Sequence, residues 1–172
     1  GIVGLTGKMG QRVKNLLDID SYAICSGGVS SSSNVKDFEN IVERSDIVID
    51  FSHNDATELA VKVCQNNKKP LVSGTTALSN QCIDAIKSAA NDIPIMHASN
   101  FCVSIYLMSR FIADVAKILP DADIDILETH HKMKKDAPSG TALFLKNSME
   151  KDNINMISRR CGNCVGEHIV SF

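Results

Sequence analysis

A strong net charge, a long apolar run and an internal repeat are all missing from this sequence. Its 172 residues carry a formal net charge of −2, which gives no general attraction to nucleic acid or to anionic lipid. Any anion-binding site must therefore be local. The longest apolar runs, such as Ile47 to Ile49, are far too short to cross a bilayer, and nothing at the start is typical of a signal peptide. We expect a cytoplasmic protein that binds neither nucleic acid nor membrane.

The sequence has six cysteines, but their placement argues against a disulfide framework. Most lie in apolar or helical-looking stretches, so reduced thiols are expected; the six are Cys25, Cys64, Cys82, Cys102, Cys161 and Cys164. The pair Cys161-Gly-Asn-Cys164 has no second CxxC beside it and only His168 nearby, whereas a structural zinc site needs four ligands. We therefore expect no metal, and a simple turn between two strands at this pair.

Short apolar runs alternate with helical patterns through residues 1–101. Strands are predicted at residues 1–5, 22–25, 46–50, 70–73 and 93–96, and helices at 11–17, 37–43, 56–66 and 79–90. Ser79 stands where a helix N-cap is expected. Strand–helix alternation is typical of a parallel sheet with right-handed crossovers and helices on both faces. The pattern predicts a doubly wound, Rossmann-like α/β domain over residues 1–101.

The pattern changes after Asn100. Residues 103–119 have apolar positions at helical spacing, and residues 122–128 alternate apolar and acidic side chains as a half-buried strand does. A helix is predicted from Gly140 to about Lys151, followed by strands at residues 154–160 and 168–172. We expect a smaller α+β domain with a mixed sheet over residues 102–172, for substrate binding and oligomerisation.

A glycine-rich turn, Gly4-Leu-Thr-Gly-Lys-Met-Gly10, joins the first strand to the first helix. Residues without Cβ let backbone N–H groups approach a pyrophosphate at a helix N-terminus. The spacing differs from the common G-x-G-x-x-G, so the motif alone is equally compatible with a tight turn. Asp50 to Ser52 and Gly74 to Thr76 also follow buried strands, where ligands bind in open α/β sheets. Together these positions favour a nucleotide site.

The choice of cofactor has no charged marker. NAD-preferring sites usually place an acidic residue at the end of the second strand, about twenty residues after the glycines. The corresponding residues, 25–27, are Cys-Ser-Gly, which offer neither a carboxylate to repel a 2′-phosphate nor an arginine to pair with it. We therefore expect weak discrimination, with NADH or NADPH as the cofactor.

The segment from Glu128 to Thr141 concentrates chemistry that a solvated loop rarely needs. It contains two adjacent histidines, three lysines and a Pro-Ser-Gly-Thr turn at a helix start. A histidine can donate a proton near neutral pH, and the N–H groups of a helix start can hold carboxylates. The alternative is a lysine-rich surface loop with a helix cap. His53, His97 and His168 are isolated in the sequence and are expected to be structural, unless His53 lies near the cofactor or His168 faces the substrate.

These motifs resemble those of the dihydrodipicolinate reductase family. The signature E-x-H-H-x-x-K-x-D-A-P-S-G-T-A is matched at eleven positions: Glu128, His130, His131, Lys134, Asp136, Ala137, Pro138, Ser139, Gly140, Thr141 and Ala142. The glycine turn is similar to the family's G-x-x-G-x-M-G, and residues 50–52 to its D-F-[ST]. Residues 74–77 resemble G-T-T-G with Ala77 as a departure, and residues 98–104 resemble A-P-N-F-S-V-G with Ser99, Cys102 and Ser104 as departures. The final strands echo R-x-G-x-x-x-G-x-H-x-x-F, and family members continue beyond them with a strand and helix that have no counterpart here.

The resemblance implies hydride transfer from NADH or NADPH to a cyclic imine dicarboxylate in diaminopimelate and lysine synthesis. It implies His130 as the proton donor, Lys134 as the residue that binds and polarises the substrate, and His131, Ser139, Gly140 and Thr141 as carboxylate-binding residues. The cofactor would contact Gly4, Leu5, Thr6, Gly7, Lys8, Met9, Gly10, Phe51, Gly74, Thr75, Thr76, Ala98, Ser99, Asn100 and Phe101. It also implies a homotetramer that forms through the sheet of the second domain.

Two other functions stay open at this point. One is a Rossmann protein that senses nicotinamide redox state without turnover, which the departures at Cys102 and Ser104 favour. The His130 and Lys134 pair argues against it, because a sensor has no use for a proton donor. The other is a different amino-acid-pathway dehydrogenase on the same scaffold. An aldehyde dehydrogenase with a catalytic cysteine is disfavoured, since no cysteine lies in the signature segment.

Overall fold

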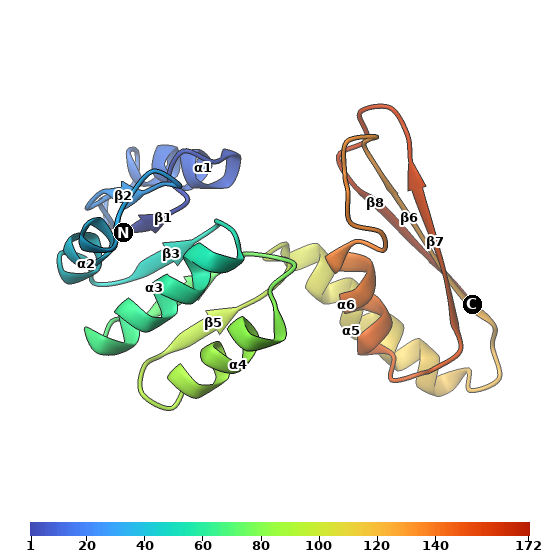
Figure 1. Cartoon of the computed structure of the whole chain (residues 1–172). Coiled ribbons are helices and arrows are strands. Elements are labelled where there is room, and N and C mark those ends of the chain that lie inside the picture. The colour runs from blue at the N-terminus through green and yellow to red at the C-terminus, as the bar shows by residue number, and fades with distance from the viewer. The chain divides into compact units, whose positions relative to one another are not determined.

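The computed structural model describes residues 1–172 and divides between Ala98 and Ser99 into two units (Figure 1). Unit 1 comprises residues 1–98 and unit 2 comprises residues 99–172. Each unit has its own cluster of buried apolar side chains. No helix is long and apolar enough to cross a membrane.

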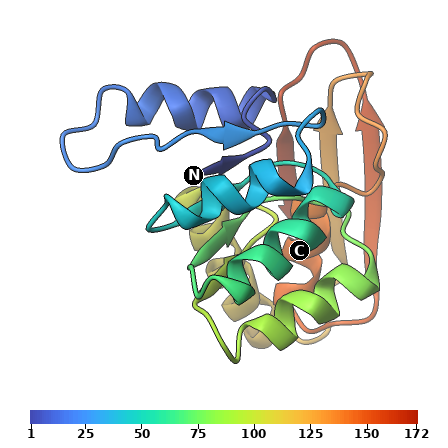
Figure 2. The same ribbon diagram turned by 60° about the vertical axis from the view of Figure 1, so that its left-hand side comes forward.

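Unit 1 is built on a five-stranded, all-parallel sheet in the order β2-β1-β3-β4-β5. The strands are β1 (Ile2–Val3), β2 (Gly28–Val29), β3 (Val48–Asp50), β4 (Leu71–Ser73) and β5 (Ile95–His97), and they alternate with α1 (Lys8–Leu17), α2 (Val35–Glu43), α3 (Asn54–Asn66) and α4 (Asn80–Ala89). The neighbouring helices α2, α3 and α4 cover one face, and α1 covers the other (Figure 2). The predicted doubly wound, Rossmann-like sheet is confirmed.

The core of unit 1 lies mainly between the sheet and the helices α2, α3 and α4. Fully buried strand residues such as Val48 and Leu71 meet Ala60 and Cys64 of α3. The helix starts follow the sequence signals, since Ser79 accepts a hydrogen bond from the Cys82 N–H at the start of α4. Short parallel strands with helices between them bring the strand-end loops to one edge of the sheet.

The second strand lies later in the chain than the sequence analysis predicts. Residues 22–25 are outside any strand, and Tyr22 and Ile24 are 99% and 86% exposed. β2 is instead Gly28–Val29, where Gly28 pairs with Ile2. A Cβ on Gly28 would lie 2.5 Å from the Ile2 carbonyl oxygen. Because the two backbones approach this closely, a glycine is favoured at this position of the strand over the larger residues upstream. The loop that follows β2 therefore begins at Ser30.

Unit 2 pairs two helices with a three-stranded mixed sheet in the order β7-β6-β8. The helices are α5 (Val103–Ile118) and α6 (Gly140–Ser148), and the strands are β6 (Ile124–His130), β7 (Ile154–Arg160) and β8 (Glu167–Ser171). β6 runs parallel to β7 and antiparallel to β8, so the predicted mixed sheet is confirmed. The alternation of β6 turns Ile124 and Ile126 toward the helices, where Leu145 of α6 is fully buried with them.

Candidate active site

The glycine turn of unit 1 cannot accept larger residues at two of its positions. Gly4 has a φ of +83°, and a Cβ there would lie 2.4 Å from the Phe51 carbonyl oxygen. A Cβ on Gly10 would lie 2.1 Å from the Gly4 carbonyl oxygen. Gly7 is more tolerant of substitution, since a Cβ there would lie 3.2 Å from the Gly4 carbonyl oxygen, its nearest neighbour. The turn is therefore folded tightly against the end of β3.

The first helix begins without a side-chain cap, and an open cavity lies at its start. The other three helices of unit 1 are capped by Asn34, His53 and Ser79, whereas the N-cap of α1 is Gly7, which has no side chain. A cavity of about 230 Å³ is lined by Gly4, Thr6, Gly7, Ser30, Ser31, Phe51 and Ser52, among others. A helix start that lacks a side-chain cap and whose N-cap residue lines a cavity is suited to an anion such as a pyrophosphate. The residues present thus fit a dinucleotide.

A buried carboxylate ties together the loops that follow β3 and β4. Asp50 is fully buried and accepts a hydrogen bond from the Ser52 hydroxyl. Its Oδ2 also accepts from the hydroxyls of Thr57, Ser73 and Thr75, at 2.7, 2.7 and 2.9 Å. The Thr75 hydroxyl in turn accepts from the Ser52 N–H at 2.9 Å. Four hydroxyl donors therefore hold this carboxyl group, and they fix the loops on either side of Phe51.

The loop after β4 shows how the departure at Ala77 is accommodated. Ala77 adopts a φ of +56°, the left-handed conformation that glycine reaches without strain. Gly74, by contrast, has to be a glycine because a Cβ there would lie 2.1 Å from the Phe51 ring. The histidines of unit 1 have local partners: His53 caps α3, and His97 Nε2 lies 3.1 Å from the Thr75 carbonyl oxygen.

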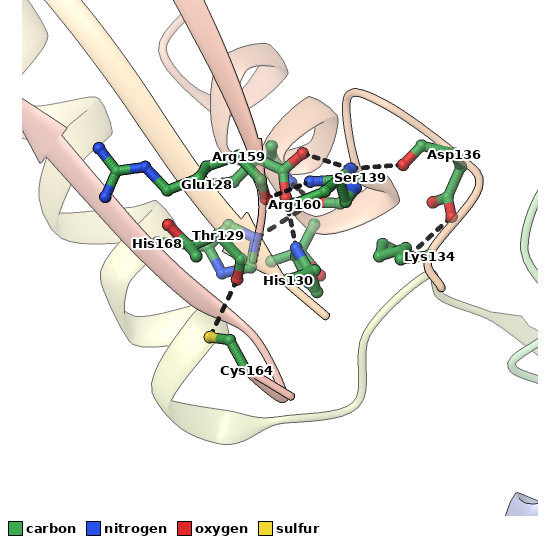
Figure 3. Close-up of polar contacts among 12 residues, drawn as sticks. Glu128, Thr129, His130, Lys134, Asp136, Ser139, Arg159, Arg160, Cys164 and His168 are labelled. Atoms are coloured by element: carbon green, nitrogen blue, oxygen red, sulfur yellow. Dashed lines mark hydrogen bonds and ion pairs between the residues drawn. The ribbon is translucent and has the colours of Figure 1, made fainter. Parts of the chain in front are cut away.

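Unit 2 contains a buried ionic network at the end of β6. Glu128 is 1% exposed, and its Oε1 accepts a hydrogen bond from the Arg160 guanidinium at 2.7 Å. Its Oε2 contacts His130 Nδ1 (Figure 3). Burial raises the pKa of the Glu128 carboxyl, but hydrogen bonds with Arg160, Ser158 and His130 outweigh burial and lower the pKa to about 2. The carboxylate is therefore charged at neutral pH.

Strand register explains why these side chains meet. Glu128 and His130 are two residues apart on β6, so they share the face that packs on the helices. Across the sheet, His130 pairs with Arg160 of β7, and Glu128 pairs with His168 of β8. The rings of His130 and His168 are 5.3 Å apart and nearly perpendicular. Burial lowers the pKa of His168, and the neighbouring His130 lowers it further.

The loop after β6 places positive charge beside this network. Lys134 Nζ lies 2.9 Å from Asp136 Oδ1. Burial raises the pKa of the Asp136 carboxyl, but the hydrogen bond from Lys134 contributes to a net lowering. Arg160 also donates to the Asp136 carbonyl oxygen at 2.5 Å, and the Lys132 N–H donates to the Gly162 carbonyl oxygen at 3.2 Å. The basic loop is therefore held against β7 and against the turn that follows it.

The Ser-Gly-Thr segment forms the first turn of α6, as the sequence predicts. The Ser139 hydroxyl caps the helix by accepting from the Ala142 N–H at 3.2 Å, and it lies 3.2 Å from His168 Nε2. Thr141 Oγ1 accepts from Asn100 Nδ2 at 2.9 Å. The start of α6 thus joins Asn100 and the His168 ring within unit 2.

Glu128, Arg160 and His168 are the members of this cluster that the sequence motifs did not assign to the site. His168, which is isolated in the sequence, contacts both His130 and Ser139 in the structure. The usable signal for Glu128 was its spacing of two residues from His130 on a predicted strand. Arg160 and His168 lie about 30 and 40 residues away in sequence, and only the strand register brings them to the site.

Neither metal chemistry nor a disulfide is favoured by these residues. Ligand atoms of Glu128, His130 and His168 lie within 4.8 Å of one another, but the Arg160 guanidinium occupies one Glu128 oxygen and repels a cation. All six cysteines are free thiols. Cys161 and Cys164 lie in the turn between β7 and β8, as predicted, and the Cys161 N–H donates to the His130 carbonyl oxygen at 2.9 Å.

Comparison with known proteins places both units in one family. The family model for the N-terminus of dihydrodipicolinate reductase matches residues 1–101, and that for its C-terminus matches residues 104–172. The 4-hydroxy-tetrahydrodipicolinate reductase of Alkaliphilus oremlandii (strain OhILAs) is 36% identical over 192 aligned residues, which cover 99% of this chain and 78% of that protein. Its counterpart in Rickettsia rickettsii (strain Sheila Smith) is 34% identical over 191 residues, covering 100% of this chain and 79% of that protein.

Solved structures show the same fold. The dipicolinate-bound dihydrodipicolinate reductase from Paenisporosarcina sp. TG-14 has a TM-score of 0.70 at 21% identity, covering 98% of this chain and 80% of that one. An aspartate semialdehyde dehydrogenase with NADP from Candida albicans has a TM-score of 0.56 at 12% identity, covering 99% of this chain and 70% of that one. Because the two family models together match nearly the whole sequence, and the relatives align over its full length, this chain belongs to the dihydrodipicolinate reductase family.

Proposed function

We propose that this protein reduces 4-hydroxy-tetrahydrodipicolinate with a nicotinamide cofactor. The observation that carries the proposal is the buried pair of Glu128 and His130, which lies at the base of a loop that carries Lys134 and ends at the start of α6. A proton donor, a cationic group and helix N–H groups together suit a substrate with two carboxylates that gains a hydride and a proton. Membership of the reductase family supports the same reaction.

The chemical roles are divided between the two units. The nicotinamide cofactor supplies the hydride when it is bound. His130 donates the proton, and Lys134 leaves its ion pair with Asp136 to bind and polarise the substrate. His131 and the Ser139-Gly140-Thr141 turn hold the carboxylates, because the α6 start presents N–H groups and a positive dipole end. The dicarboxylate named with the Paenisporosarcina structure is consistent with this anion site.

The cofactor is proposed to bind along the glycine turn and the neighbouring strand ends. Gly4 to Gly10 would hold the pyrophosphate, and the loops that Asp50 anchors would present Phe51 and Gly74 to Thr76. Residues 98–101 are proposed as further nicotinamide contacts by their similarity to the family motif. Each of these assignments can be tested by replacing the residue and measuring the affinity for the cofactor.

We further propose that NADH and NADPH are both used. After β2 the cavity is lined by Ser30 and Ser31, so these serines, rather than residues 25–27, are proposed to face the ribose of the cofactor. Hydroxyls can hydrogen-bond a ribose hydroxyl or a 2′-phosphate, whereas a carboxylate would reject the phosphate. We expect specificity constants for the two cofactors to differ by less than about a hundredfold, or about 2.7 kcal/mol.

A cytoplasmic homotetramer is proposed, with the sheet of unit 2 as the contact. The face of this sheet opposite the helices carries one apolar row across the three strands, because Leu127 pairs with both Ile157 and Ile169. Ile157 is 47% and Ile169 is 45% exposed. Exposed apolar side chains that are contiguous on a sheet are typical of a subunit contact.

A coupled assay tests the proposed reaction directly. The unstable substrate is generated in the cuvette by its synthase, and the loss of reduced-cofactor absorbance is followed with NADH and then with NADPH. Turnover with either cofactor supports the proposal. A nicotinamide sensor would bind the cofactor in calorimetry without turnover, and a different dehydrogenase would oxidise cofactor only with another substrate. Either result would contradict the assignment.

A further inference from the structure

The Glu128 carboxylate leaves His130 only one way to carry a single proton. An ionised carboxylate is an acceptor and never a donor. Because Glu128 is charged and its Oε2 contacts His130 Nδ1, Nδ1 must carry a hydrogen in the neutral as well as in the protonated ring. The hydrogen that can be given away is therefore the one on Nε2.

The surroundings of Nε2 are consistent with this division of the ring. A Cβ on Gly166 would lie 3.0 Å from His130 Nε2, so a glycine leaves room beside this nitrogen where any other residue would crowd it. The opposite side of the ring is fixed by Glu128. Glu128 thus holds the ring at Nδ1, and no side chain at position 166 blocks Nε2.

Arg160 connects the carboxylate to the substrate-binding loop. Its guanidinium donates to Glu128 Oε1 at 2.7 Å and to the Asp136 carbonyl oxygen at 2.5 Å. It also donates to the Arg159 carbonyl oxygen at 2.8 Å, so three hydrogen bonds fix the guanidinium group. A guanidinium held in this way orients the Glu128 carboxylate and positions the loop that carries Lys134 relative to the histidine.

Of the carboxylates near the ring, Glu128 is the one that contacts it. The titratable and charged groups near His130 are Glu128 on its own strand, Arg160 on β7, His168 on β8, and Lys134 and Asp136 on the loop. Asp136 is paired with Lys134, so Glu128 supplies the acceptor for His130 Nδ1. Without Glu128, the hydrogen on Nδ1 would lose this acceptor.

We propose that Glu128 is a positioning residue for the reduction, which fixes the tautomer and orientation of His130, and that Arg160 holds Glu128 in place. The proposal rests on the proposed role of His130 as proton donor. In the step, the substrate gains a hydride from the cofactor, the Nε2–H bond of the protonated ring breaks, and its proton forms a new bond to the substrate atom that needs it. His130 is left neutral with its hydrogen on Nδ1, against Glu128, and takes a new proton from water.

The tautomer can be measured in the unaltered protein. Histidine labelled with ¹⁵N in the ring reports which nitrogen is protonated through its chemical shift, and a His130→Gln sample assigns the signals. In neutral His130 of the wild-type enzyme we expect the hydrogen on Nδ1 and an unprotonated Nε2. A ring with its hydrogen on Nε2 would overturn the proposal whether or not any variant folds, and this measurement does not depend on activity.

Kinetics of Glu128→Gln give the second test. Glutamine keeps the size of the side chain but loses the charge, so we expect kcat to fall about tenfold or more, as part of the general-acid contribution of about 10²–10⁴. KM should change little, because Glu128 contacts the histidine and is proposed to act through it rather than on the substrate. Glu150→Gln is the matched control, since it makes the same change at an exposed glutamate of the same unit. Its kcat and KM should equal those of the wild type.

The outcomes separate this inference from the proposed function. If His130→Ala abolishes turnover and Glu128→Gln has the wild-type kcat and tautomer, the positioning role is wrong while the proton donor stands. If His130→Ala turns over normally, the proton donor itself is misassigned and the positioning role falls with it. Glu128→Asp, which retains the charge on a shorter chain, should restore kcat in part and keep the hydrogen of neutral His130 on Nδ1, whereas a merely structural role would leave the tautomer unchanged in Glu128→Gln as well.

Discussion

Replacing Asp50 by asparagine should loosen the cofactor-binding edge of unit 1. This carboxylate is fully buried, and it accepts hydrogen bonds from the hydroxyls of Ser52, Thr57, Ser73 and Thr75. The substitution keeps the shape of the side chain but turns one acceptor oxygen into an NH₂ donor. Whichever way the amide is oriented, at least one hydroxyl then faces a donor.

The size of the effect follows from the hydrogen bonds that are lost. A hydrogen bond to a charged group contributes about 1.5–3 kcal/mol, and an amide recovers part of this when the hydroxyls rotate to accept. Burying a neutral amide also costs less than burying a charge, which opposes the loss. We expect a net destabilisation of about 2 kcal/mol. Because Thr75 also binds the Ser52 N–H, the two strand-end loops should shift together and weaken cofactor binding about tenfold, or 1.4 kcal/mol.

Chemical denaturation and calorimetric titration with NADH measure the two quantities. Asp46→Asn is the matched control, since Asp46 is exposed at the start of the same strand region and should have neither effect. An Asp50→Asn protein that matches the control in both stability and affinity would show that the hydroxyl cage does not organise this edge.

Four further predictions concern the turns, the buried ion pair and the assembly. Gly10→Ala should destabilise unit 1 and abolish cofactor binding in calorimetry, because its Cβ would lie 2.1 Å from a backbone oxygen, whereas Gly7→Ala, at 3.2 Å, should have a much smaller effect. Ala77→Gly should raise the free energy of unfolding by about 1 kcal/mol, since φ is +56° at this position; equal denaturation midpoints would contradict this. The pKa of Glu128 is lowered on folding from 4.5 to about 2, so its charge stabilises the fold above about pH 4.5. This stabilisation, about 3 kcal/mol, is lost as the pH falls toward 2. The free energies of unfolding of wild type and Glu128→Gln, measured in urea, should therefore converge over this range, and a constant difference would refute the linkage. Light scattering should give a tetramer mass for the wild type and a smaller mass for Ile157→Lys, and a monomeric wild type would contradict the proposed contact.

The outline of the fold could be predicted because most elements carry their own signals. Buried β-branched runs, helix caps such as Ser79 and the alternation of β6 each require only local physics. The second strand could not be placed this way. Its position depends on the close approach of Gly28 to the Ile2 backbone, whereas the apparent strand residues Tyr22 and Ile24 have no neighbouring strand to bury them.

The candidate site could be predicted where its residues are close in sequence. His130 and Lys134 lie in one motif, and the glycine turn lies in another. The partners that give His130 its orientation could be named only once the register of β7 and β8 was known, because Arg160 and His168 come from separate strands. A sequence pattern indicates which side chain carries the chemistry, but the strand pairing determines which charges surround it.

Turnover of the His130→Ala enzyme tests the central claim most directly. The wild type and the variant are compared in the coupled assay at saturating NADH, with NADH affinity measured separately by calorimetry. We predict that kcat falls by about a hundredfold or more, as expected for the loss of a general acid, while cofactor affinity stays unchanged because the glycine turn lies in unit 1. A His130→Ala enzyme with the full wild-type kcat would contradict the account and leave this histidine as a structural residue of its loop.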